Sequence, residues 1–237
     1  VNMNQMFQSA TVFNQNISGW DISQISNNYN NFINQSTTLN NGDYLPRFQK
    51  SISSDEIQNA VNLSHNITFN QNTGSGDGYY VYSFISNWDV SEVTDMNSLF
   101  NNATAFNQDI SDWNVSQVTN MSNMFNQAIL FNQNIGSWNV SQVKNMMNMF
   151  LTNTLTTTVF NQDISAWNVE QVTDMSNMFN GANQFNQNIG SWNVSKVFNM
   201  YGLFVFTKKF NQDISSWNVS QVTDMNVMFQ MAEDFNH

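Results

Sequence analysis

The sequence predicts an α/β solenoid of about eight coils, in which each 25-residue repeat supplies one short parallel strand and one short helix. Three observations predict it. The last six tryptophans, from Trp88 to Trp217, lie 25, 25, 29, 25 and 25 residues apart. A polar phrase returns almost unchanged, as "FNQDISDWNVSQVTNM" at 106–121 and as "FNQDISSWNVSQVTDM" at 210–225. The apolar positions recur in the same register as the phrase.

The first half of the unit predicts the strand. In the unit that begins at Phe106, Trp113 and Val115 are two residues apart, and side chains at that spacing point to one face of a strand. The spacing of Ile110, Trp113 and Val115 also matches the strand of a leucine-rich repeat. We therefore expect a right-handed, leucine-rich-repeat-like coil in which the Ile and Trp side chains point inward and stack in ladders.

The second half of the unit predicts the helix. Its apolar residues are three and four positions apart, which is the helical period, and they are Val118, Met121, Met124, Phe125 and Ala128. Ser116 or Thr119 can cap such a helix. The next phrase, from Phe131, then turns the chain back toward the following strand. A single unit buries too little apolar surface to fold alone, so each coil must stack on its neighbours.

The chain is predicted to be one repeat solenoid over 1–237, with insertions at 33–68 and 73–84. Removing 31 extra residues between Phe32 and Phe69, and 12 between Asn72 and Ile85, restores the spacing of 25. Both ends of the chain fall within a unit, as expected of a window from a longer array.

One position of the unit alternates between two residue types along the chain. The fourth residue of the phrase reads Asp109, Asn134, Asp163, Asn188 and Asp213. Duplication of a two-unit block explains the alternation, and so does repulsion between Asp side chains stacked about 4.8 Å apart. The sequence leaves both explanations open. The alternating Asn also dilutes the charge that a calcium site would need, so no metal is expected.

Composition excludes several classes of function. The net charge of -11 repels nucleic acid and anionic membranes. The absence of cysteine excludes disulfides and thiol chemistry, and no apolar run approaches the roughly 18 residues that span a bilayer. The two histidines, His65 and His237, have no other ligand type at motif distance, and no nucleophile or phosphate-loop motif is present. We therefore expect no enzyme, no catalytic residue and no cofactor.

The repeated phrase resembles a known surface-protein repeat. The pattern W-[ND]-V-S-x-V-T-[DN]-M-S-x-M-F, followed by F-N-Q-D-I-S, is similar to the 25/26-residue repeat of BspA-like leucine-rich-repeat proteins of bacterial surfaces, mycoplasma lipoproteins and large algal viruses. The match is close over Trp88–Phe235 and fainter over Val1–Phe32. The resemblance implies a solenoid outside the cell or particle, often linked to adhesion, and it implies no particular ligand.

The predicted function is a surface-exposed, non-enzymatic module for adhesion or for protein or glycan interaction. The alternative is a structural segment of an extracellular or virion fibre that grows by end-to-end or lateral stacking of solenoids. Expected partners are a protein or carbohydrate on another surface, or copies of the chain itself. Nucleic acid and direct membrane insertion are not expected.

Two sets of residues are candidates for partner contact. The insertions carry interface-type side chains, since Tyr and Arg often anchor interfaces: Tyr44, Arg47, Phe48, Tyr79, Tyr80 and Tyr82. Alternatively, the insertions form a small subdomain that buries these rings. The second set lies on the outward face of the predicted strands, a flat and nearly uncharged surface: Asp112, Asn114, Asn139, Asn193 and Asn218.

Overall fold

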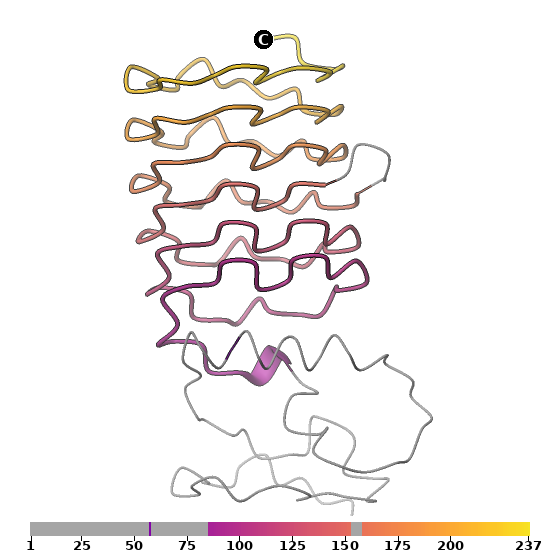
Figure 1. The fold of residues 1–237 in the computed structure, drawn as a ribbon, viewed down its shortest axis with the longest axis vertical. Coiled ribbons are helices and arrows are strands. Elements are labelled where there is room, and N and C mark those ends of the chain that lie inside the picture. The colour runs from indigo at the N-terminus through magenta and orange to yellow at the C-terminus, as the bar shows by residue number, and fades with distance from the viewer. Residues whose placement is uncertain (1–56, 58–84, 153–157) are drawn as a thin grey trace, which may run out of the picture.

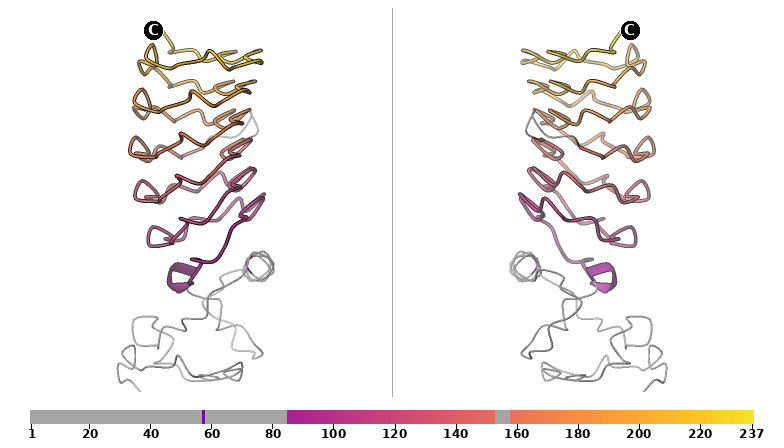
Figure 2. Two further views of the ribbon diagram at one scale, coloured as in Figure 1. Left: turned by 90° about the vertical axis from the view of Figure 1, so that its left-hand side faces the viewer. Right: turned by 90° about the vertical axis from the view of Figure 1, so that its right-hand side faces the viewer.

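The computed structural model describes residues 57, 85–152 and 158–237, and the last two of these ranges form a stack of coils (Figure 1). Isolated parallel β-bridges join one residue of each coil to its equivalent in the next, through Asp95, Asn120, Asn145, Asp174, Asn199 and Asp224. We number the coils 1 to 6, for the described residues within 85–105, 106–130, 131–159, 160–184, 185–209 and 210–237, so that coil 3 comprises 131–152 and 158–159. The side views show the coils following one another along the long axis (Figure 2).

Regular secondary structure is nearly absent from these coils. The 3-10 helix η2 spans Ile85–Asn87, at the start of coil 1. Elsewhere in 85–152 and 158–237 there is no α-helix, and β pairing is limited to the isolated bridges. The prediction of a helix over 118–128 is therefore wrong, and so is the prediction of a regular strand over 110–115.

Left-handed residues explain why the expected helix does not form. In coil 2, Asn123 and Gln127 have φ angles of 57° and 62°. The equivalent residues of coil 1, Ser98 and Asn102, have φ angles of 59° and 61°. A right-handed helix needs negative φ at every residue, so a left-handed residue at every fourth position breaks it. Asn adopts this conformation more readily than most residues, which gives one reason for its frequency in the unit.

The backbone donors of this segment alternate between two kinds of partner. The N–H of Met124 donates to the carbonyl of Met121 at 3.2 Å and closes a local turn, whereas the N–H of Phe125 donates to Met149 in the next coil at 2.9 Å. The segment is thus a parallel ladder built from tandem turns. Such turns present apolar side chains inward at spacings of three and four, which the sequence pattern does not distinguish from a helix.

The predicted inward positions are confirmed even though the backbone differs. All nine predicted inward residues are buried, eight in coil 2 and Phe131 at the start of coil 3, with at most 6% of any of them exposed: Ile110, Trp113, Val115, Val118, Met121, Met124, Phe125, Ala128 and Phe131. The burial of apolar surface therefore follows the sequence pattern, and the hydrogen bonding does not.

The core consists of columns of stacked rings. Trp88 and Trp113 stack with centroids 6.3 Å apart and planes inclined by 15°, as the repeat register predicts for neighbouring coils. Phe100 stacks on Phe125 at 5.4 Å, and the column continues through Phe150 at 5.6 Å. These separations exceed the roughly 4.8 Å between paired strands, so the rings are offset from one another.

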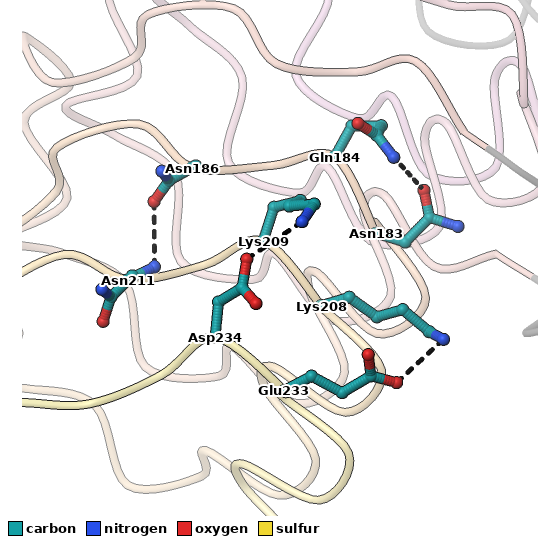
Figure 3. Close-up of polar contacts among 8 residues, drawn as sticks. All are labelled: Asn183, Gln184, Asn186, Lys208, Lys209, Asn211, Glu233 and Asp234. Atoms are coloured by element: carbon teal, nitrogen blue, oxygen red, sulfur yellow. Dashed lines mark hydrogen bonds and ion pairs between the residues drawn. The ribbon is translucent and has the colours of Figure 1, made fainter.

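On the side of the stack where a strand was predicted, hydrogen bonds from side chains connect neighbouring coils. The indole Nε1 of Trp138 donates to the carbonyl oxygen of Ile110 in the preceding coil at 3.1 Å. The Asn of each F-N-Q phrase makes a second connection, because its Oδ1 accepts the backbone N–H of its equivalent one coil later. Asn186 and Asn211 make this contact at 2.9 Å (Figure 3). Gln212 adds a bond from its Nε2 to the Oδ1 of Asn186 at 2.8 Å.

A close contact between neighbouring coils gives a packing reason why residue types alternate from one coil to the next. The carbonyl oxygen of Asp163 lies so near Gly136 that any Cβ on Gly136 would clash with it. Gly190 and Asp213 repeat this relation two coils later. In the intervening coil the equivalent residue is Ser165, which comes two residues after Asp163, whereas Gly136 and Gly190 each come two residues after an Asn. Glycine in alternate coils thus permits a contact that a serine side chain would prevent.

Candidate functional site

The outer surface is a series of Asx turns, in which an Asn or Asp side chain accepts the N–H of the residue two positions on. The predicted residues Asn114, Asn139 and Asn193 each do so, from Ser116, Ser141 and Ser195, at 3.2 Å. Asn218 does the same from Ser220 at 3.1 Å. All four Asn residues are exposed, as expected, but they lie in turns and not on a strand.

The remaining predicted residues divide into one described position and six that lie outside the described residues. Asp112 is exposed, two residues before Asn114 in coil 2. The six interface-type side chains of the insertions are not among the described residues, so their expected role stays a prediction: Tyr44, Arg47, Phe48, Tyr79, Tyr80 and Tyr82.

The alternating Asp and Asn residues make a second column of Asx turns. Asp163 accepts the N–H of Ser165 at 2.9 Å, and Asn134 accepts the N–H of Gly136 at 3.0 Å. The hydroxyl and N–H of Ser165 lower the pKa of Asp163, because both stabilise the ionised carboxylate. The N–H and hydroxyl of the following serine lower the pKa of Asp109 and Asp213 in the same way. The Asx turn therefore forms with either residue, and the charge alternates from coil to coil together with the Ser or Gly that follows two positions later.

Ion pairs connect coils 5 and 6 at one corner. Lys208 Nζ lies 2.9 Å from Glu233 Oε1, and Lys209 Nζ lies 3.1 Å from Asp234 Oδ2 (Figure 3). The four side chains are 45% to 57% exposed, so each pair contributes about 0–1 kcal/mol to stability. Their main effect is to neutralise the charges of Lys208 and Lys209 at this corner.

An exposed aromatic pair escaped the sequence analysis. Phe198 and Tyr201 of coil 5 are 47% and 39% exposed. At these positions coil 4 carries Thr173 and Ser176, and coil 6 carries Thr223 and Asn226. The signal was the local departure from the repeat in "SKVFNMYG" at 195–202. Such a departure gives one coil a surface chemistry that the other coils lack, and a consensus of the repeat does not contain it.

Carboxylates lie on both sides of this aromatic pair. Asn199, between the two rings in the sequence, pairs with Asp174 in coil 4 and with Asp224 in coil 6 through the parallel bridges. Its Nδ2 donates to Oδ2 of Asp174 at 3.3 Å, and its Oδ1 accepts the N–H of Tyr201 at 3.1 Å. Asn199, which separates the two rings in the sequence, thus lies between two acidic positions, and the column neighbours of Phe198 are Thr173 and Thr223.

Comparison with protein families agrees with the repeat. The family model described as "Mycoplasma protein of unknown function, DUF285" matches residues 1–75, 68–164 and 151–237. The chain belongs to the DUF285 family. Three tandem matches that together cover the chain are what a repeat architecture requires. No curated protein and no solved structure matches this DUF285 chain.

Two further findings on the described DUF285 coils concern metal binding and membrane-spanning helices. Over the described ranges, no three His, Cys, Asp or Glu side chains are grouped so that they could hold a metal ion. Among the same residues, no helix is long and apolar enough to cross a membrane. The described surface presents polar turns in register, interrupted by the aromatic pair of coil 5.

Proposed function

We propose that this DUF285 chain is a non-enzymatic repeat module, exposed on a cell or particle surface, that mediates adhesion through protein or glycan contacts. The proposal includes a right-handed solenoid related to the BspA-like leucine-rich repeats, since the inward Ile, Trp and Val residues keep the spacing of that repeat although they form no regular strand here. Membership in a family of tandem repeats supports a repeat module.

The regular outer surface is the observation that carries this proposal. Each coil presents the same Asx turns, so Asn114 and Asn139 lie at equivalent places on successive coils with their side chains held by backbone N–H groups. Preorganised polar groups lose little conformational entropy when they bind, and many equivalent sites can act together. A repeated surface of this kind suits a partner that is itself extended or repeated.

The distribution of titratable groups supports a role other than catalysis. General acid–base chemistry needs groups that converge on one reacting atom. The carboxylates with a lowered pKa, Asp109, Asp163 and Asp213, lie in alternate coils of the same column and each is occupied by its own Asx turn. Such carboxylates are suited to shaping turns.

Adhesion of particles coated with the full chain to a cell monolayer tests the proposal. A variant in which 33–68 is shortened to five residues and 73–84 is removed keeps the spacing of 25 and assigns the contact. Loss of adhesion in this variant assigns contact to the insertions, whereas full retention assigns it to the coils. If particles carrying the intact chain adhere no better than particles carrying albumin, the proposal is wrong.

A structural fibre is the second candidate, and the ladder between coils favours it. Coil 2 donates the N–H of Phe125 to coil 3, and coil 3 donates the N–H of Phe150 to coil 4, at 2.9 Å in both cases. Because the pattern repeats without change, it can in principle continue across molecules. Mass measurement in dilute solution separates the candidates: a stable monomer favours the adhesion module, and end-to-end polymers favour the fibre.

A further inference from the structure

Phe198 and Tyr201 are exposed in the interior of the stack. Coil 5 has coil 4 on one side and coil 6 on the other, so these rings are exposed because they point outward. Val219, Met225 and Met231 are also exposed, but they belong to coil 6, beyond which no coil is described. Leu130 and Val159 are exposed aliphatic residues at the ends of coils 2 and 3. Two exposed aromatic side chains, three residues apart on a polar surface, make this turn a candidate contact site.

The rings lie in an acidic environment. Asp174 and Asp224 are the bridge neighbours of Asn199, so their backbones lie about 4.8 Å to either side of the turn that carries the rings. One oxygen of Asp224 accepts the N–H of Asn226 at 2.9 Å. The two lysines of the neighbouring corner, Lys208 and Lys209, are paired with acidic residues of their own. The turn that carries the aromatic pair therefore has a carboxylate in the coil on either side of it, and the cations nearest to it along the chain and the column are Lys196 and Lys144.

We propose that Phe198 and Tyr201, together with Asp174 and Asp224, form a docking site for a cationic segment of a partner protein. An Arg or Lys side chain is attracted to the face of an aromatic ring, and carboxylates at either side add complementary charge. This inference rests on the proposed role as an interaction module and specifies the chemistry of one partner.

Lys196 provides a test of whether the partner is positively charged, neutral or negatively charged. It is exposed, two residues before Phe198, and its Nζ donates to Oε1 of Gln171 at 3.0 Å. The equivalent residues of coils 4 and 6 are Gln171 and Gln221, so Lys196→Gln restores the residue of the adjacent coils. Removing this positive charge should strengthen binding of a cation, leave a neutral glycan unaffected, and weaken binding of an anion.

The repeat supplies variants that preserve the coil. The double variant Phe198→Thr/Tyr201→Ser introduces the residues of coil 4, Thr173 and Ser176. The double variant Asp174→Asn/Asp224→Asn introduces the residue found at the equivalent position in coil 5. Asp163→Asn removes the same charge from coil 4 in a different column, where Asn134 and Asn188 already make the same Asx turn. It is the control for general electrostatic attraction.

The test measures binding of the full chain to a fluorescein-labelled peptide of alternating Arg and Gly, with citrulline in place of Arg as the neutral control peptide. We expect the ring variant to bind about two- to fivefold more weakly for each ring lost. The double Asp→Asn variant should weaken binding about two- to fivefold and reduce its dependence on salt. Lys196→Gln should strengthen binding about twofold, and Asp163→Asn should change it by less than about twofold.

Three results would overturn the inference: equal affinity of the ring variant and the natural chain, equal binding of the citrulline peptide, or weaker binding after Lys196→Gln. In each of these cases, retained adhesion of coated particles to the monolayer leaves the proposed function standing. Conversely, peptide binding that depends on the rings, in a chain that does not adhere, supports the docking site and counts against the proposed adhesion.

Discussion

The indole of Trp138 donates its Nε1 hydrogen to the carbonyl oxygen of Ile110, 3.1 Å away in the preceding coil. Trp113 makes the same bond to Ile85 at 2.8 Å, so the contact belongs to the repeat. It gives a buried carbonyl its donor on the side of the stack where the coils lack a strand. The tryptophan of each unit therefore both fills the core and connects neighbouring coils.

Trp138→Phe should lower the free energy of unfolding by about 1–3 kcal/mol, because the buried carbonyl of Ile110 loses its donor. Urea unfolding followed by circular dichroism measures the change. Phenylalanine is also smaller than tryptophan, so benzothienylalanine at position 138, which has the tryptophan shape without the N–H, isolates the hydrogen bond. Unchanged stability with benzothienylalanine would show that the bond contributes nothing.

Gly136→Ala should destabilise the stack by about 1–3 kcal/mol, the range for an overpacked site, because the new Cβ would meet the backbone carbonyl of Asp163. The matched control is Ser165→Ala at the equivalent position of the next coil, which loses only a hydroxyl contact with an exposed carboxylate. Thermal unfolding of both variants ranks them. Equal melting temperatures would mean that the coils can separate at this corner without penalty.

Asn186→Ala should destabilise the chain by about 1–2 kcal/mol, because the Oδ1 of Asn186 accepts both the N–H of Asn211 and the Nε2 of Gln212. Asn186→Asp keeps the acceptor and should cost much less. Hydrogen exchange of the Asn211 amide gives a local readout, with faster exchange in the Ala variant alone. Faster exchange in the Asp variant as well would mean that the amide group of Asn186, and not only its oxygen, matters.

Stability should fall in acid through Asp109, Asp163 and Asp213. Their pKa is lower in the folded chain than the ordinary value of 3.8, so the folded state favours the ionised form. The stabilisation is fully present above pH 3.8 and is lost as the pH falls through the folded pKa. Urea midpoints between neutral and acidic pH measure it.

The triple Asp→Asn variant at these positions keeps the Asx turns, as Asn134 and Asn188 show at 3.0 and 3.1 Å. It should therefore lose less stability in acid than the natural chain does. If the two chains lose stability in parallel as the pH falls, the acid sensitivity comes from other carboxylates.

The candidate surface was only partly predictable from sequence. The exposure of Asn114 and Asn139 follows from their place beside the buried Trp113 and Trp138, because alternate positions face opposite ways. The aromatic pair at 198 and 201 was visible as a departure from the repeat, but its neighbours were not. Asp174 and Asp224 are about 25 residues away from it in either direction, and only the stacking of coils brings them beside Asn199.

The sequence by itself determined the length of the coil and the identity of its core, because buried apolar residues must recur with the period of the structure that buries them. Trp113, Met121 and Phe125 were assigned inward on that basis and are buried. Only the tertiary structure decided how the backbone between them is paired. Spacings of three and four fit both a helix and tandem turns, and the choice depends on whether Phe125 finds its acceptor in its own coil or in the next, at Met149. Hydrogen bonds between coils favour the turns, and no single repeat contains that information.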